Sequence, residues 1–282
     1  MLGLIKADLY RVLKDKLFIV LSILCVVIAI GYTLIYFAAI YLIATESGVD
    51  VRNYCGAYGL ALSMLGPGSG FGLPLGIFMI IILHKDISNG TIRNKIAMGK
   101  SRKQVYFANL IVSLIYILGF VFVHLVISFV IATIFFNPGI TYENALSYFV
   151  STILIFAGWA ALVCVVSFFT SAIKSVGPAI ILYIVFTVGS ATLGAITSNV
   201  VMIAEGRNEV LYNLLKFFTN FNFVYAITSI LPGESGVLAA IGAVMDTPLT
   251  GEFYAAYLSS LVFFGGLATG LGLLIFEKAD LK

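Results

Sequence analysis

"LFIVLSILCVVIAIGYTLIYFAAIYLIA", residues 17–44, is the stretch that decides the fold, because it runs for 28 residues without a charged side chain. A helix needs about 20 mostly apolar residues to cross the hydrocarbon core of a bilayer. Comparable runs cover residues 108–136, 146–170, 176–196 and 254–276, and a sixth, at 60–83, contains several Gly and Pro. We therefore predict an all-α, polytopic integral membrane protein with six transmembrane helices, in one domain covering residues 1–282.

Composition supports this fold class. The chain is 61% apolar and 10% charged, with a mean hydropathy of +1.10, whereas soluble domains are about 45–50% apolar and about 25% charged. The run at 17–44 is longer than the apolar region of a secretory signal, which has about 7–15 residues, so we expect no signal peptide. The three cysteines, Cys25, Cys55 and Cys164, indicate neither a disulfide framework nor a metal site.

The sixth run contains "GPGSGFGLPLG", residues 66–76, which is rich in helix-breaking residues. Such residues are tolerated inside a bilayer where neighbouring helices, side chains or water satisfy the freed backbone groups. We expect an irregular outer half and a helix that begins near Gly72.

Lysine and arginine predict the orientation, because they accumulate in the short loops on the cytoplasmic side. With six spans, thirteen of the sixteen Lys and Arg fall on the side that holds both termini, together with five of the thirteen Asp and Glu. Both termini are therefore predicted to be cytoplasmic, in the plasma membrane of a bacterium. Residues 197–253 form an extracellular excursion of interfacial or re-entrant helices, because polar residues interrupt the apolar stretch 210–231.

The leader, residues 1–16, has apolar residues at helical spacing. Leu2, Ile5, Leu9, Val12 and Leu13 repeat along it, and the charged residues, including Asp8 and Arg11, lie mostly on the other side. This pattern predicts an interfacial helix. A plain helical extension of the first span fits the same periodicity.

The cytoplasmic loop 84–107 holds six Lys and Arg in 24 residues. Asn89-Gly90 predicts a turn, Thr91 is a candidate cap for a short helix from Ile92 to Met98, and Gly99 can end that helix in the left-handed conformation. Ser101 and Gln104 form a candidate capping box for the next span. We expect Ile92 and Ile96 on one face of the short helix, with Arg93 and Lys95 turned elsewhere.

Three roles compete for this charge: fixing the topology beside anionic membrane lipid, binding nucleic acid, and docking a cytoplasmic partner. Nucleic-acid binding is not expected, because no nucleic-acid-binding fold accompanies the patch. The motif Gly99-Lys100-Ser101 imitates the end of a phosphate-binding loop, but Asn94 stands where that loop needs Gly. No nucleotide site is predicted.

Two further features are candidates for function. The second cytoplasmic loop, "TSAIKSVGP" at 170–178, is either a contact turn or a plain helical hairpin. His124 is the ionisable side chain predicted deep inside a span, and such groups are candidates for a transport path. A neutral His124 that hydrogen-bonds to a neighbouring helix is the alternative.

In this order the elements resemble a permease subunit of the type-2 ATP-binding cassette (ABC) exporters. The resemblance covers nearly the whole chain and is most specific in the first loop, "GTIRNKIAMGKSRKQVYFAN". Other matching elements are the leader "DLYRVLKDK", "SILPGES" before the last span, and the tail "FEKADLK". The chain departs from the family at Met98-Gly99-Lys100, where a Pro often precedes the Ser-Arg.

The resemblance implies two permease subunits, either two copies or this chain with a sister permease, and two cytoplasmic ABC ATPase subunits. The helix from Thr91 to Met98 would be the coupling helix, seated on the ATPase, and Lys174 and Ser175 would form a second contact. The residues of the coupling helix and its flanks are Gly90, Thr91, Ile92, Arg93, Lys95, Ile96, Lys100, Ser101 and Arg102. The chain itself would be no enzyme and would hold no cofactor or metal, with ATP and Mg in the partner ATPase.

The spans have no charged residues, which favours a hydrophobic or amphipathic cargo such as a peptide, an antibiotic or a lipid. An intramembrane enzyme is disfavoured, because the chain has only two His, at positions 84 and 124. A secondary transporter, or a sensory or immunity component without an ATPase, remains the alternative, although ion-coupled transporters usually carry charged groups inside their spans.

Overall fold

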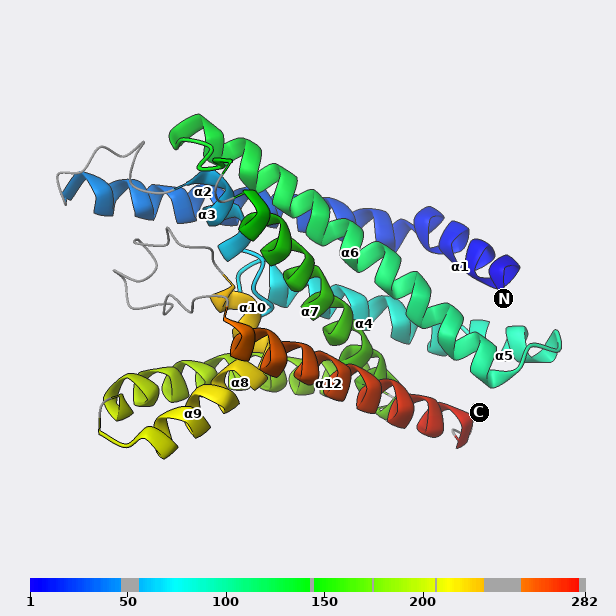
Figure 1. Ribbon diagram of the computed structural model, residues 1–282. Coiled ribbons are helices and arrows are strands. Elements are labelled where there is room, and N and C mark those ends of the chain that lie inside the picture. Colours follow the sequence, from blue (N-terminus) through cyan, green and yellow to red (C-terminus); the bar gives the residue numbers. More distant parts are fainter. Residues whose placement is uncertain (47–55, 143–144, 174, 206, 231–249, 279–282) are drawn as a thin grey trace.

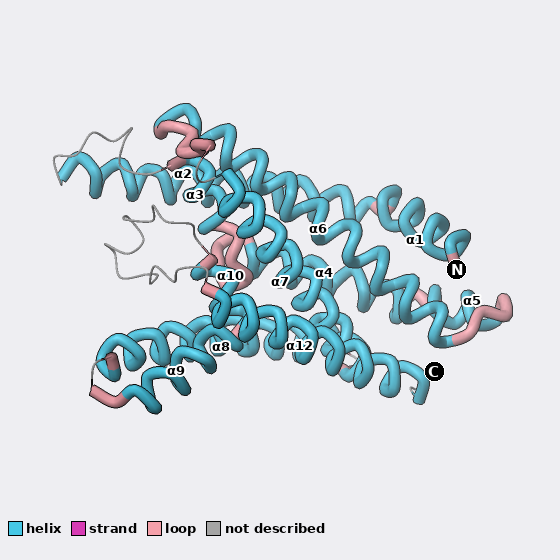
Figure 2. The backbone as a smooth tube through the Cα atoms, viewed as in Figure 1, coloured by secondary structure: helices cyan, strands magenta, loops and turns pink. Residues whose placement is uncertain are grey.

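The computed structural model describes residues 1–46, 56–142, 145–173, 175–205, 207–230 and 250–278, and the described residues form helices joined by turns (Figure 1, Figure 2). The side chains of residues 43, 44 and 229 are also outside the description. The helices are α1 (Leu2–Lys14), α2 (Lys16–Glu46), α3 (Ala57–Ser63), α4 (Gly72–Ser88), α5 (Thr91–Ala97), α6 (Arg102–Phe135), α7 (Ala145–Ala172), α8 (Val176–Ala204), α9 (Glu209–Phe221), α10 (Phe223–Ser229) and α12 (Gly251–Lys278).

Five of these helices, α2, α6, α7, α8 and α12, are long and apolar enough to cross a membrane. A sixth crossing is present if α4 and α5, which meet at a bend of 51°, are counted as one broken span. The chain is therefore an all-α, multi-pass membrane protein. Helices suit this setting because they satisfy their own backbone hydrogen bonds.

Helix α7 is the centre of the bundle. It packs against α12, α6, α4, α8, α10 and α3, and 56% of its most apolar window is buried, against 17–22% for α2, α8 and α12. The exposed sides of the outer helices remain apolar, with side chains such as Ile35, Ile181 and Val262 more than 60% exposed. An apolar outer surface is what a lipid-facing helix requires.

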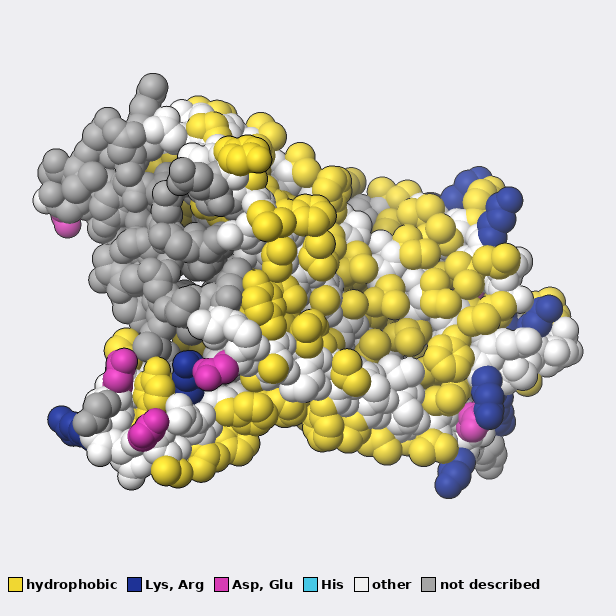
Figure 3. Space-filling view, in the orientation of Figure 1, with side chains coloured by type: hydrophobic (Ala, Val, Ile, Leu, Met, Phe, Trp, Pro, Cys, Tyr) yellow, Lys and Arg dark blue, Asp and Glu magenta, His cyan; other side chains and the backbone are white. Residues whose placement is uncertain are grey.

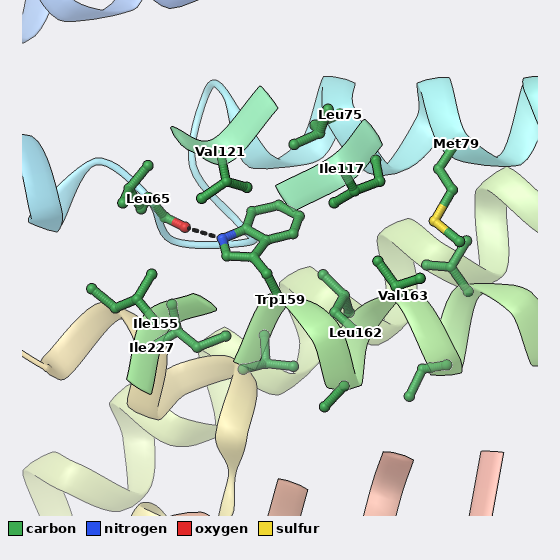
Figure 4. Packing of buried hydrophobic residues seen from close by; sticks show 14 of the residues in the cluster. Leu65, Leu75, Met79, Ile117, Val121, Ile155, Trp159, Leu162, Val163 and Ile227 are labelled. Atoms are coloured by element: carbon green, nitrogen blue, oxygen red, sulfur yellow. Dashed lines mark hydrogen bonds between the residues drawn. The ribbon is translucent and has the colours of Figure 1, made fainter. Parts of the chain in front are cut away.

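The break between α3 and α4 follows the prediction, since α4 begins at Gly72 and residues 64–71 are irregular. Donors from distant helices satisfy its backbone. The indole nitrogen of Trp159 on α7 donates to the backbone carbonyl of Leu65 over 2.8 Å (Figure 4). The hydroxyl of Tyr183 on α8 donates to the backbone carbonyl of Gly72 over 3.0 Å. Such partners allow irregular backbone at membrane depth.

Residues 209–229 form two short helices instead of one long one. Helix α9 lies beside α8, and α10 turns back against α7 and α8 (Figure 1). Asn222 separates them: its side chain accepts from the backbone N–H of Tyr225 at 3.3 Å and donates to the carbonyl of Ser190 at 2.7 Å. The polar residues that interrupt the apolar pattern therefore end one helix and begin the next.

Several helices extend beyond the apolar runs that predict them. Helix α6 begins at Arg102, where its predicted run begins at 108, and α8 continues to Ala204, where its predicted run ends at 196. The extra turns carry polar residues that hydrophobicity alone does not include. Local caps and the packing of α9 on α8 set these ends instead.

Candidate functional site

The N-terminus, the end of α12 and helix α5 lie at one end of the molecule, the basic end (Figure 1). Dark blue Lys and Arg side chains gather there, while apolar side chains cover the middle of the visible face (Figure 3). The described basic residues of α1, α2, α4, α5, α6 and α12, with the turns between them, are Lys6, Arg11, Lys14, Lys16, Lys85, Arg93, Lys95, Lys100, Arg102, Lys103 and Lys278.

Helix α5 begins and ends at glycines with positive φ. Gly90, φ 67°, makes the bend between α4 and α5, and Gly99, φ 80°, follows the helix as predicted. Most L residues avoid this conformation because of their Cβ atom. The observed helix covers Thr91–Ala97, one residue earlier at each end than predicted.

Thr91 does not cap α5, so this prediction is wrong. The N-cap is Gly90, which has no side chain to accept from the helix, and Thr91 is the first helical residue. The Thr91 hydroxyl instead accepts a hydrogen bond of 3.2 Å from Arg11 on α1. The preference of glycine for the bend outweighs the gain from a threonine cap.

The apolar face of α5 anchors the helix. Ile92 is 2% exposed and packs with Val105 and Tyr106 of α6 and Phe276 of α12. Ile96 is half-buried against the same cluster. These two residues share one face, as predicted, and they hold the helix to the bundle instead of presenting it to a partner.

Lys95 is also buried, which corrects the prediction that it turns away from Ile92 and Ile96. Its ammonium group lies 2.7 Å from a carboxylate oxygen of Asp8 and 3.0 Å from the side-chain oxygen of Asn109. Both side chains of the Lys95–Asp8 pair are 5% exposed. A buried charge requires such a partner, so Lys95 fastens α5 to α1.

Three of the five predicted apolar residues of α1 pack on the bundle, since Val12 is buried and Ile5 and Leu9 are partly buried against the core. The other residues of this face, and one charge, differ from the prediction. Asp8 and Val12 are buried, whereas Leu2 and Leu13 are 84% and 52% exposed. The prediction placed Asp8 on the polar side because periodicity does not show an ion pair with another helix. Helix α1 is held by charges as well as by apolar contact.

A second ion pair joins α1 to α4. The Arg11 guanidinium donates to both carboxylate oxygens of Asp86, over 2.6 and 2.5 Å, and lies 3.8 Å from Asp8. Burial lowers the pKa of Arg11, but the hydrogen bond and charge of Asp86, with the charges of Asp8 and Asp15, outweigh it and raise the pKa overall. Arg11 therefore stays charged and links the two helices.

A third pair lies at the junction of α1 and α2. Lys85 donates to both oxygens of Asp15 over 2.6 Å. This hydrogen bond is the main reason why the pKa of the Asp15 carboxyl lies below its usual value, and burial opposes it. The three pairs, Lys95–Asp8, Arg11–Asp86 and Lys85–Asp15, are called the α1 clamp below.

The start of α6 is fixed locally and by the C-terminal helix. Ser101 and Gln104 form the predicted capping box, each side chain bonding the other residue's backbone over 3.3 Å. Arg102 donates to the carbonyl of Glu277 over 2.5 Å, and Lys103 lies 3.7 Å from the Glu277 carboxylate. Arg102 is therefore engaged within the chain.

What remains exposed around α5 is a small surface of mixed chemistry, the α5 tip: Arg93, Asn94, Ala97, Met98, Lys100 and Ser101. Met98 is 71% exposed. The sequence does not predict this exposure, because the apolar character of Met98 matches the buried side of a helix.

Of the second predicted contact, Ser175 is exposed and precedes α8, whereas Lys174 lies outside the described residues. The same turn contains Ile173, whose backbone oxygen lies 3.0 Å from the ring of His84 on α4. The structure does not join it to the α5 tip by any contact between the described side chains.

His124 is 1% exposed and lies inside the bundle. Its ring stacks on Phe71 at 3.9 Å, and its Nε2 is 3.4 Å from the Ser128 hydroxyl, which is 3.0 Å from the hydroxyl of Thr33 on α2. Among the described residues its Nδ1 has no hydrogen-bond partner. The hydrogen bond of His124 therefore stays within α6 and reaches α2 only through Ser128, so a direct bond to a neighbouring helix is not seen among the described residues.

A small cavity lies beneath α5, between α4, α6, α7 and α12, with a volume of about 30 Å³. The hydroxyls of Tyr106 and Ser167, both buried, line it and have no partner among the described residues. One water molecule needs about 10–15 Å³ of cavity volume, counted as the space open to the centre of a water-sized sphere. Two water molecules fit and would satisfy both hydroxyls.

The fold and this end of the bundle define a multi-pass helical membrane protein that presents a short, clamped helix. No protein family, curated protein or solved structure matches the chain. The function is therefore inferred from the chain's own residues and geometry.

Proposed function

We propose that the chain is the permease subunit of an ABC exporter, with α5 as its coupling helix. ATP is hydrolysed in separate cytoplasmic ATPase subunits, and the cargo is a hydrophobic or amphipathic molecule such as a peptide, an antibiotic or a lipid. In this proposal there are six spans, the basic end faces the cytoplasm, α1 is the N-terminal interfacial helix, and a second permease copy or sister permease completes the path.

The observation that supports this function best is the way α5 is held. A seven-residue helix is too short to be stable alone, so its contacts with the rest of the chain hold it in place. Here one side of α5 is fixed to α1 by Lys95 and to α6 and α12 by Ile92, while Arg93 and Met98 remain exposed. A helix fixed on one side and exposed on the other can transmit a push into the bundle.

The α1 clamp connects α5 mechanically to the membrane helices. Force on the α5 tip reaches α1 through Lys95 and Asp8, and α4 through the bend at Gly90. Helix α1 leads into α2, and α4 leads to the break at residues 64–71. The membrane helices α2 and α4 therefore share one input.

Co-purification tests the proposal. The full-length chain is expressed in its native host with an affinity tag and isolated in mild detergent, and bound P-loop ATPase is identified by mass spectrometry and by ATP hydrolysis. We expect Arg93→Glu and Met98→Asp each to reduce the bound ATPase at least tenfold. Ile96 is a poorer probe, because its side chain also anchors α5.

Lys6→Glu is the matched control, since Lys6 is exposed at the same end and the substitution makes the same change of charge. It should leave the bound ATPase unchanged. If Arg93→Glu and Met98→Asp recover as much ATPase as the unmodified chain, α5 is not the coupling helix. If the unmodified chain recovers no ATPase, the assignment as an ABC exporter subunit is refuted.

A further inference from the structure

His84 is a buried histidine in the last turn of α4, just before the bend into α5, and its side chain is not part of the α5 tip. Both of its ring nitrogens meet backbone carbonyl oxygens. Nδ1 lies 3.0 Å from the oxygen of Ile80, one turn earlier in α4, and Nε2 lies 3.0 Å from the oxygen of Ile173, in the turn between α7 and α8.

The two carbonyl oxygens favour one protonation state of the His84 imidazole. A neutral imidazole has one N–H donor and one acceptor nitrogen, whereas carbonyl oxygens only accept. With a neutral His84, one ring lone pair would face a carbonyl lone pair at 3.0 Å. Only the imidazolium form, with an N–H on each nitrogen, donates both hydrogen bonds.

The position of Ile173 also favours a positive charge. The N–H of Ile173 bonds to the carbonyl of Phe169, so the Ile173 carbonyl belongs to the C-terminal end of α7. The last carbonyls of a helix lack partners within the helix and carry its partial negative charge. A cation is stabilised there, and histidine ordinarily changes its charge between pH 5 and 8.

The charged neighbours of His84 on α4 have partners elsewhere, since Lys85 binds Asp15 and Asp86 binds Arg11. The described parts of α7 and α8 contain no Asp, Glu, Lys or Arg, and Lys174 lies outside the described residues. The helices that pack against α4 carry the following remaining titratable groups: Tyr148 and Cys164 on α7, Tyr183 on α8, Arg93 and Lys95 on α5, Lys16, Cys25, Tyr32, Tyr36, Tyr41 and Glu46 on α2, and Arg102, Lys103, Tyr106, Tyr116 and His124 on α6. The helix end, rather than a carboxylate, is thus the partner for a charged His84.

We infer that His84 is a positioning residue whose imidazolium form ties α4 to the C-terminal end of α7, and that loss of its proton breaks one of the two hydrogen bonds. The tie joins the element that leads into α5 to the turn that holds Ser175. Its role in coupling rests on the proposed function, because only then are both elements contacts for an ATPase.

Nuclear magnetic resonance tests the proton directly. The full-length chain, labelled with ¹⁵N-histidine, is purified in micelles, and the His84 signals are assigned as those that disappear in His84→Gln. With only two histidines in the chain, the spectrum of His124→Gln gives a second assignment. We expect both nitrogens of His84 to carry protons at pH 6, because each faces a carbonyl oxygen. A His84 with one protonated nitrogen at pH 6 would overturn the inference.

Hydrogen exchange of the α7–α8 turn tests the tie. At pH 6 the amides of residues 172–177 should exchange at least threefold faster in His84→Gln than in the unmodified chain, because glutamine cannot donate to both carbonyls through a rigid ring. Equal exchange at pH 6 would refute the tie. Both measurements use the chain without any ATPase, so their failure is distinguishable from failure of the proposed function.

Discussion

Removing one partner of the buried pair between Lys95 and Asp8 should destabilise the protein strongly. At 2.7 Å, and with an effective dielectric constant of about 20, their Coulomb attraction is about 6 kcal/mol. The cost of taking both charges out of water offsets most of this attraction, so the net contribution of the pair is small. Loss of one partner, however, leaves the other charge buried, and that costs about 3–5 kcal/mol.

For Lys95→Met we expect the lower end of this range, about 3 kcal/mol, because Arg11 lies 3.8 Å from Asp8 and compensates part of its charge. For Asp8→Asn we expect a similar loss, since Asn109 remains as an acceptor for Lys95. The double variant removes both charges. It should cost at least 2 kcal/mol less than the sum of the single variants.

Reversible unfolding in mixed micelles with a rising fraction of sodium dodecyl sulfate measures these free energies. Lys100→Met is the control, because Lys100 is exposed on the same segment, and its substitution should change the stability by less than about 0.5 kcal/mol. Additive losses in the double variant, or single losses as small as that of the control, would refute the buried ion pair.

Three further predictions concern other parts of the fold. Gly76→Ala should cost about 1–3 kcal/mol of unfolding free energy, because an added Cβ would collide with the ring of Tyr183, and thermal denaturation measures it. Asp15→Asn should make stability depend less steeply on pH at the acid end. The pKa of the Asp15 carboxyl is lowered in the folded protein, so its bond with Lys85 stabilises the fold above the unfolded pKa of about 3.9 and is lost as the pH falls through the folded pKa. Unfolding free energies measured from pH 2 to 6 test this. Trp159→Phe should cost about 1–3 kcal/mol, because a buried carbonyl loses its donor, and circular dichroism follows the unfolding.

Controls and opposite outcomes for these predictions are simple. Gly189→Ala meets no atom within 4 Å, so it should leave the denaturation temperature unchanged or raise it, and equal effects at both glycines would contradict the collision. A parallel acid limb in Asp15→Asn would show that the pair adds no stability. Unchanged stability in Trp159→Phe would mean that the Leu65 carbonyl finds another donor.

The sequence predicts those parts of the fold that depend on neighbouring residues. The apolar runs indicate the membrane helices because the bilayer requires their length and composition. The start of α6 follows from Ser101 and Gln104, and the end of α5 from Gly99, since both signals act within a few residues. The short helix of the candidate site is therefore visible in the sequence.

Its buried ion pairs are not. Asp8 and Lys95 are separated by 87 residues, and each alone has the pattern of an exposed charge on an amphipathic helix. The same holds for Arg11 and Asp86, which are 75 residues apart. Only the packing of α1 on α6 and beside α4 brings these groups together, so periodicity places Asp8 on the exposed side of α1 and turns Lys95 away from the bundle.

The break between α3 and α4 has a consequence for the order in which the protein is made. The donors to its carbonyls come late in the chain, since Trp159 follows Leu65 by 94 residues and Tyr183 follows Gly72 by 111. At a synthesis rate of about 5–20 residues per second, the break waits roughly 5–20 seconds for its partners. Residues 57–88 therefore enter the membrane before they can take their final shape. Helices α3 and α4 reach their native arrangement only after α7 and α8 have been synthesised and inserted.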